Sequence, residues 1–267
     1  MRSKFVILTA TALSFGFAQA ASAADMPTKM PMKAPPMVAA PYNWTGFYGG
    51  VYVGGAFGSR DATATDPVST AAPFIGPYDL ANPLSYNVDS SFIAGGTLGY
   101  NFQTGNWVFG PELEFGYMRL TGSGTFTGGI SNGELSATSV SGDWYGVLAA
   151  RVGYAWDNVL VYAKGGAALV RQKASVVDTT VSAINPGLLD AESDRTKVGF
   201  AVGGGVEWAF APKWSVKAEY LYLGVNSSDS ACGVDTGAAS LGFGATFCSP
   251  VTFPAIHTGK VGINYHF

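Results

Sequence analysis

Charged residues are scarce in this sequence of 267 residues and make up only 12% of it, roughly half of the ~25% found in ordinary soluble domains. Basic residues are also the minority, with 15 Lys and Arg against 18 Asp and Glu. Nucleic-acid binding needs a basic surface, which such a composition does not supply. We therefore expect no nucleic-acid partner.

Long apolar runs are missing as well. Beyond residue 23, no continuous apolar stretch reaches the ~18 residues that a membrane-spanning helix requires. Glycine and the aromatic residues are nevertheless abundant, with 36 Gly, 17 Phe, 13 Tyr and 6 Trp. A charge-poor, aromatic-rich chain without helical spans favours a β-barrel in a membrane.

The first residues predict export. Arg2 and Lys4 form a short cationic start, residues 5–17 form an apolar core, and Ala21-Ser22-Ala23 is a small-residue cleavage site. We interpret residues 1–23 as a signal peptide, whose removal leaves 13 basic against 18 acidic residues and a net charge of −5. Residues 24–43 are rich in Pro and Met and predict a periplasmic lead-in before a barrel over 44–267.

Cysteine and histidine are each limited to two residues. Cys232 and Cys248 lie in one predicted loop of an exported chain, which favours a disulfide over two free thiols. No His lies near them to complete a metal site. His257 and His266 have ordinary interpretations as interfacial or rim residues, so we expect no catalytic residue, no metal and no cofactor.

Alternating polar and apolar residues recur along the rest of the chain. In the segment after Arg195, the residues Val198, Phe200, Val202, Val206 and Trp208 share one face of a strand, since side chains alternate with a period of two. The pattern predicts an all-β fold, an eight-stranded antiparallel up-and-down transmembrane β-barrel, with strands at 44–58, 90–104, 106–121, 142–157, 158–175, 195–211, 213–228 and 255–267.

The predicted connections alternate in length. Tight turns fall at Gly105-Asn106, Asp157-Asn158 and residues 211–213, and long polar loops at 59–89, 122–141, 176–194 and 229–254. Outer-membrane barrels have short periplasmic turns and long extracellular loops. We expect the outer membrane of a Gram-negative cell, with both mature termini in the periplasm.

We expect the more polar face of each predicted strand to line the lumen of the barrel. An eight-stranded barrel is just wide enough for side chains to fill it, so charges there should pair with one another. The predicted lumen network comprises Glu112, Glu114, Arg151, Lys164, Lys197, Glu207, Lys217, Glu219 and Lys260. Two interpretations remain open, a structural plug and a narrow polar conduit.

Tryptophans gather near predicted strand ends, where amphipathic rings suit the lipid headgroup zone. We expect an aromatic girdle made of Trp44, Trp107, Trp144, Trp156, Trp208 and Trp214. Trp144 lies at the opposite strand end from the others and would belong to the outer girdle.

Three stretches resemble a known family: residues 43–50 (NWTGFYGG), 213–222 (KWSVKAEYLY) and 261–267 (VGINYHF). In this order they are similar to the porin-family small outer-membrane β-barrel proteins of Gram-negative bacteria, grouped with the OmpA-like transmembrane barrel. The resemblance implies an eight-stranded barrel, and a C-terminal aromatic signal, here Tyr265 and Phe267, that the barrel-assembly machinery recognises.

These observations predict a monomeric, non-catalytic barrel that supports the cell envelope, contacts outer-membrane lipid and lipopolysaccharide, and presents its loops as a surface antigen. Two alternatives stay open. The lumen could serve as a narrow channel for ions or small solutes, or the extracellular loops could act as an adhesin or receptor.

Overall fold

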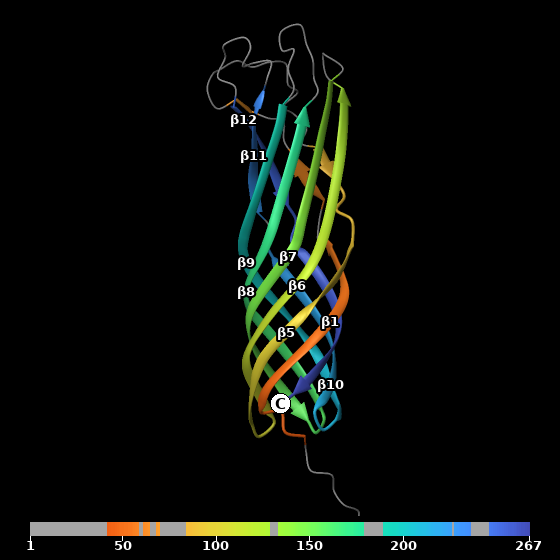
Figure 1. Cartoon of the computed structure of the whole chain (residues 1–267), viewed down its shortest axis with the longest axis vertical. Helices are drawn as coiled ribbons and strands as arrows, with labels where there is room; N and C mark the ends of the chain where they lie inside the picture. Colours follow the sequence, from red (N-terminus) through yellow and green to blue (C-terminus); the bar gives the residue numbers. More distant parts are fainter. Residues whose placement is uncertain are drawn as a thin grey trace, which may run out of the picture. The chain divides into compact units, whose positions relative to one another are not determined.

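Eight antiparallel strands close into a ring in the computed structural model (Figure 1). They pair in the order β1, β5, β6, β7, β8, β9, β10 and β13, and β13 pairs back to β1. This arrangement confirms the predicted eight-stranded barrel. The ring strands are β1 (Gly46–Gly58), β5 (Ser91–Thr104), β6 (Trp107–Gly128), β7 (Gly133–Trp156), β8 (Val159–Asp178), β9 (Leu189–Ala211), β10 (Trp214–Gly224) and β13 (Ile256–His266).

The structure describes residues 42–58, 61–64, 68–69, 84–128, 133–178, 189–225, 227–235 and 246–267. The predicted signal peptide and residues 24–41 of the predicted lead-in lie outside these residues. None of the described residues belongs to a helix that is long and apolar enough to cross a membrane.

The outer surface of the ring is apolar. On β6, Leu113 and Phe115 are 51% and 61% exposed, whereas Glu112, between Pro111 and Leu113 on the same strand, is buried. On β9, Phe200 and Trp208 are likewise about half exposed. Side chains of a strand alternate between its two faces, so the sequence pattern itself places apolar groups outside and charges inside. A water-soluble sheet would do the reverse.

Tight turns join neighbouring ring strands at one end of the barrel. Gly105 and Asp157 both adopt positive φ, of 59° and 51°, as tight hairpin turns require. The carbonyl of Asn106 accepts a hydrogen bond from the Ala155 amide, and that of Asn158 accepts one from the Ala209 amide. Each turn is thereby tied to the next hairpin. The third tight connection is Pro212-Lys213.

Strands extend far into the segments that the sequence analysis assigns to loops, and this corrects those assignments. β6 continues to Gly128, β7 begins at Gly133 and β9 begins at Leu189. These segments still alternate, but their outer face is polar and their inner face carries small residues such as Ala137 and Ala174, both buried. The sequence does not reveal them as strands, because their outer face lacks the apolar residues that mark a membrane-spanning strand.

Five shorter strands complete the sheet beyond the ring: β2 (Ala62–Ala64), β3 (Val68–Ser69), β4 (Leu84–Tyr86), β11 (Ser227–Asp235) and β12 (Thr246–Phe253). The predicted strand 213–228 therefore divides into β10 and β11, and β11 pairs with β12 and β9. A separate apolar cluster, which includes Val176, Val251 and Phe253, fills this region.

A disulfide joins Cys232 and Cys248, as the sequence predicts. The two residues lie directly opposite each other in the β11–β12 register. The bridge spans 16 residues of sequence, and such a closure contributes on the order of 3 kcal/mol in the chain-entropy model. It therefore fastens the β11–β12 hairpin, which is not part of the ring.

Candidate functional site

A cluster of ionised side chains occupies the lumen. Six ring strands contribute to it, and its members are four glutamates and four bases: Glu112, Glu114, Glu207, Glu219, Arg151, Lys164, Lys217 and Lys260. Each is at most 4% exposed. The inward-facing phase of each strand turns them into the lumen, and the register between neighbouring strands brings them to one level. Their formal charges cancel. We call these eight residues the lumen cluster.

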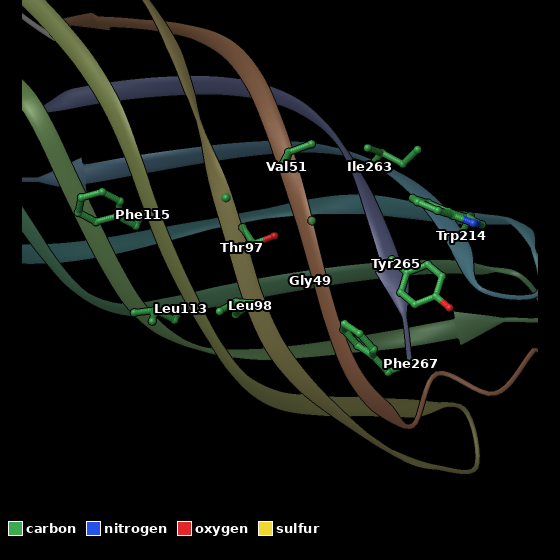
Figure 2. A pocket seen from close by; sticks show the side chains of 12 residues that line it. Gly49, Val51, Thr97, Leu98, Leu113, Phe115, Trp214, Ile263, Tyr265 and Phe267 are labelled. Atoms are coloured by element: carbon green, nitrogen blue, oxygen red, sulfur yellow. The ribbon is translucent and has the colours of Figure 1, made fainter.

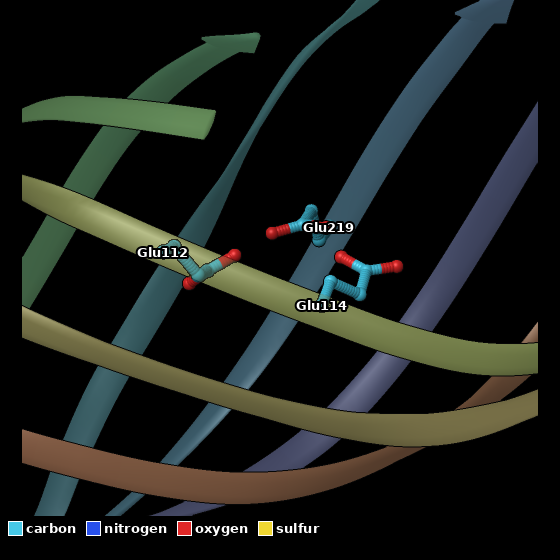
Figure 3. A group of neighbouring side chains, drawn as sticks. All are labelled: Glu112, Glu114 and Glu219. Carbon is cyan, nitrogen blue, oxygen red and sulfur yellow. The ribbon is translucent and has the colours of Figure 1, made fainter. Parts of the chain in front are cut away.

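Lys164 lies at the centre of the lumen cluster. Its Nζ is 2.7 Å from Glu112 Oε1, 2.9 Å from Glu114 Oε2 and 2.8 Å from Glu219 Oε1. Lys260 Nζ adds contacts of 2.5 Å to Glu114 and 2.8 Å to Glu219. Figure 3 shows the three carboxylates facing a common space, and their nearest oxygens lie within 4.8 Å of one another. The lysine ammonium groups supply the positive charge that this acidic group needs.

Arg151 forms the second centre. Its guanidinium pairs with Glu207 and lies 3.5 Å from Glu112 Oε2. It also stacks on the ring of Tyr162, with the guanidinium carbon 3.8 Å from the ring centroid. Arginine suits this place because its planar group can stack and pair with two carboxylates at once.

Tyrosines connect the charges to one another. Tyr48 donates a hydrogen bond of 2.7 Å to Glu112, Tyr162 donates one of 2.8 Å to Glu219, and Tyr145 donates one of 2.8 Å to Glu114. The hydroxyl of Tyr52 lies 2.8 Å from that of Tyr145. These tyrosines are not among the residues predicted for the lumen, although Tyr162 has the same inward phase as Lys164, which is a signal present in the sequence.

Lys197 is not part of the lumen cluster, which corrects its predicted place. Its Nζ pairs with Asp229 of β11 at 3.3 Å. Burial tends to raise the pKa of Asp229, but hydrogen bonds from Ser193 and Lys197 outweigh it and hold this pKa below its ordinary value. The Lys197–Asp229 ion pair and the tight turns lie on opposite sides of the lumen cluster. At the level of this ion pair, β9 stops pairing with β10 and begins to pair with β11. Strand phase alone does not reveal this difference in depth.

Apolar layers enclose the lumen cluster from both ends. At the end with the tight turns, Trp44, Val108 and Leu160 form a buried cluster. At the other end, Ile93, Leu221 and other residues form a second one. The charges are thus separated from water along the barrel axis as well as by its wall.

Trp44 is fully buried in the first of these layers, so its assignment to the aromatic girdle is wrong. Its Nε1 donates a hydrogen bond of 3.4 Å to the Asp157 carbonyl, and its backbone amide donates one of 2.8 Å to Gln103 Oε1. Because Trp44 precedes β1, it can fold under the barrel instead of following the strand phase. Trp107, Trp156, Trp208 and Trp214 are exposed outward, and Trp144 is half-buried against Phe115.

Ser215, His266 and Glu207 lie together, but their geometry does not suit nucleophilic catalysis. Ser215 Oγ donates a hydrogen bond of 2.5 Å to Glu207, while His266 Nε2 lies 3.0 Å from the same Oγ and 3.4 Å from the same carboxylate. In a catalytic triad the serine faces one imidazole nitrogen and the acid faces the other. His257 lies on the outer face, with its Nδ1 2.5 Å from the Tyr220 hydroxyl.

The last strand ends beside an apolar groove on the outer surface (Figure 2). The groove has a volume of about 600 Å³, and Gly49, Leu98, Trp214 and Phe267 are among its lining residues. The Phe267 amide donates a hydrogen bond of 3.0 Å to the Phe47 carbonyl, which ties the chain end to β1. Its ring is 76% exposed and rests 5.2 Å from that of Tyr265.

The chain is similar to several known proteins. The model of the outer membrane protein beta-barrel domain family matches residues 8–247. The 31 kDa outer-membrane immunogenic protein of Brucella melitensis is 33% identical, over 99% of this chain and all of the relative. The 25 kDa outer-membrane immunogenic protein of Brucella canis is 29% identical over 83% of this chain and 85% of the relative. Among solved structures, the outer membrane protein OprG from Pseudomonas aeruginosa has 14% identity and a TM-score of 0.48, covering 85% of this chain and 99% of that one. The family match and the similarity to the full-length Brucella melitensis relative show that this chain belongs to the outer membrane protein beta-barrel domain family.

Proposed function

We propose that the protein is a sealed, non-catalytic barrel that supports the outer membrane and holds its extracellular strands at the cell surface. The observation that carries this proposal is the burial of the lumen cluster, whose members are 0–4% exposed. Ions crossing a pore must meet hydrated or solvent-accessible groups along the way. Here the ionised groups contact one another, and apolar layers lie above and below them.

We infer the orientation of the barrel in the membrane from the difference between its two ends. Barrels of this kind have short periplasmic turns, so the end that carries Gly105-Asn106 and Asp157-Asn158 is assigned to the periplasm. β1 begins and β13 ends at this side, so we propose that both termini of the barrel lie in the periplasm. β11, β12 and the extended parts of β6 to β9 then lie outside the cell, where antibodies would reach them. We propose a monomer surrounded by lipid and lipopolysaccharide.

The narrow channel is the alternative that planar-bilayer recordings test directly. The purified, refolded protein is expected to give no resolved openings, because opening a path requires several buried ion pairs to separate together. Lys197→Ala, outside the lumen cluster, serves as the matched control. Openings of defined conductance whose ion preference changes in Glu219→Gln, but not in this control, would overturn the proposal in favour of a channel.

We also propose that the terminal aromatics guide assembly. Phe267→Ala is expected to slow insertion and to lower the outer-membrane level several-fold. Because Phe267 is 76% exposed in the folded barrel, the free energy of unfolding should change by less than about 1 kcal/mol. Pulse-labelling followed by heat-modifiable gel migration measures the insertion rate.

The matched control for this change is Phe47→Ala. Phe47 is 66% exposed and lies at the same rim, paired through its carbonyl with the Phe267 amide. Loss of an exposed aromatic at this level should by itself have little effect on insertion. Equal insertion rates for the wild-type protein and Phe267→Ala, or equal defects in both variants, would contradict a signal role for Phe267.

A further inference from the structure

The outer surface changes from apolar to charged at one level on four adjoining strands. Away from the tight turns, Tyr117 is followed on the outer face of β6 by Arg119, and Leu169 on β8 by Arg171 and Lys173. On β7 the change falls between Trp144 and Asp143, and on β9 between Val198 and Asp194. From Trp107 to Tyr117, roughly ten steps of ~3.4 Å at a tilt of ~40° rise about 25 Å, which is the height of the apolar band of such barrels.

Ion pairs link the charged groups at this boundary. Arg171 makes two hydrogen bonds to Asp194, of 2.9 Å from Nε and 2.6 Å from Nη2. Lys173 Nζ lies 2.6 Å from Asp143 Oδ2, and Arg171 Nη1 lies 3.9 Å from the same oxygen. Arg119 lies opposite Gly142 in the β6–β7 register, and Gly142 is the neighbour of Asp143 in the sequence. Together, Arg119, Arg171, Lys173, Asp143 and Asp194 form what we call the boundary cluster.

The backbone is shaped to build this cluster. The register of β7 against β8 shifts between Ser141 and Tyr145, and within this bulge Gly142 and Asp143 have φ of 122° and 71°. A positive φ is uncommon for a residue other than glycine, and such strain persists where the surroundings impose it. A Cβ at Gly142 would lie 1.9 Å from the Met118 carbonyl oxygen. The bulge turns Asp143 outward toward Lys173 while Tyr145 keeps its place inside.

We propose that Arg119, Arg171 and Lys173 bind a phosphate group of a glycolipid in the outer leaflet. Three bases against two acids leave the boundary cluster with a net positive charge. Its ion pairs are partly exposed, with side-chain exposures of 25–48%, so they hold the bases only weakly and an anion can replace the carboxylates. Guanidinium groups bind phosphate oxygens in a bidentate manner. The proposal rests on the orientation given under Proposed function.

The surface next to the boundary cluster suits the acyl chains of the same lipid. On the membrane side lie Leu169, Val198 and the Phe115–Trp144 pair, whose ring centroids are 6.2 Å apart. A phosphate on the bases therefore places the attached hydrocarbon against apolar side chains. A glycolipid satisfies both surfaces at once, whereas free phosphate satisfies only one.

Binding of purified diphosphorylated lipid A to the full mature protein in detergent micelles tests this site, with dephosphorylated lipid A and inorganic phosphate as the other probes. The wild-type protein should prefer the diphosphorylated form. Replacing Arg119, Arg171 and Lys173 together by Ala should reduce that preference about 10- to 100-fold. Lys213→Ala, in a tight turn at the opposite rim, is the matched control and should change nothing. Heat-modifiable migration verifies that each variant is folded.

Asp194→Asn tests whether the lipid phosphate replaces the Asp194 carboxylate as the partner of Arg171. This change frees the Arg171 guanidinium and should tighten binding of the diphosphorylated lipid several-fold. Weaker binding in Asp194→Asn would indicate a bridging divalent cation and would overturn direct phosphate recognition. An unchanged preference in the triple variant, or displacement of lipid A by equimolar inorganic phosphate, would overturn the glycolipid site. None of these readouts depends on conductance, so failure of this proposal and failure of the sealed barrel are distinguishable.

Discussion

Lys164→Ala is expected to lower the free energy of unfolding by about 3–5 kcal/mol, the usual effect of removing one partner from a buried ion pair. The Lys164 ammonium contacts three carboxylates at 2.7–2.9 Å. Its loss leaves four glutamates facing three bases inside the barrel, where water cannot replace the missing charge. Urea titration of refolded protein in detergent micelles, followed by tryptophan fluorescence, measures the change.

A matched control and a compensating change separate charge from side-chain volume. Lys197→Ala removes a lysine whose side chain is 25% exposed, and its buried partner Asp229 keeps its contacts with Arg195 and Ser193. The change should therefore cost no more than about 1 kcal/mol. Adding Glu114→Gln to Lys164→Ala restores the charge balance and should recover part of the lost stability. A loss below 1 kcal/mol in Lys164→Ala, or no recovery in the double variant, would show that charge balance in the lumen is not what stabilises the barrel.

Much of the barrel could be predicted from the sequence because the membrane imposes a simple rule on each strand. Hydrocarbon outside and charges inside produce an alternation that is visible in one strand at a time, as with Leu113 and Glu114. The tight turns could also be located, since Gly105-Asn106 and Asp157-Asn158 combine residues that tolerate positive φ. These signals are local and need no knowledge of which strands are neighbours.

What the sequence could not predict depends on depth and on contacts between distant strands. Lys197 and Lys164 have the same inward phase, yet only Lys164 lies at the level of the glutamates. Trp44 looks like a girdle residue until the segment before β1 is seen to fold under the barrel. The extended parts of β6 to β9 do not follow the same rule, because beyond the apolar band the outer face is polar and the inner face carries small residues such as Ala137 and Ala174.

The boundary cluster shows the same dependence on neighbouring strands. Arg119, Arg171 and Asp194 are far apart in sequence, and each looks like an ordinary polar residue at the end of an apolar strand. The register of β6, β7, β8 and β9 places them at one level. The lumen cluster and the boundary cluster thus divide the charges of the spanning region into a buried set that balances and a surface set that does not.

The second large effect is expected from Gly95→Val, which should lower the free energy of unfolding by about 2–6 kcal/mol. Gly95 lies opposite Tyr52 in the β1–β5 register, and a Cβ there would come within 2.3 Å of the Tyr52 hydroxyl and 2.4 Å of the Phe115 carbonyl oxygen. Overpacking of this kind costs about 1–3 kcal/mol. Moving the ring also breaks its hydrogen bond to Tyr145, which leaves buried polar groups unsatisfied at a further cost of about 1–3 kcal/mol.

Gly259→Val is the matched control, because nothing lies within 4 Å of a Cβ placed on this outward-facing glycine of β13. It should change the free energy of unfolding by no more than about 0.5 kcal/mol. The same pairing occurs at Gly99, where a Cβ would lie 2.4 Å from the Tyr48 hydroxyl. Gly95 and Gly99 thus make room for two tyrosine rings, of which Tyr48 donates to Glu112 directly and Tyr52 reaches Glu114 through Tyr145. Equal stabilities of the Gly95 and Gly259 variants would mean that the tyrosine rings can move without disturbing the charges, and would remove the reason for placing glycine opposite tyrosine in this barrel.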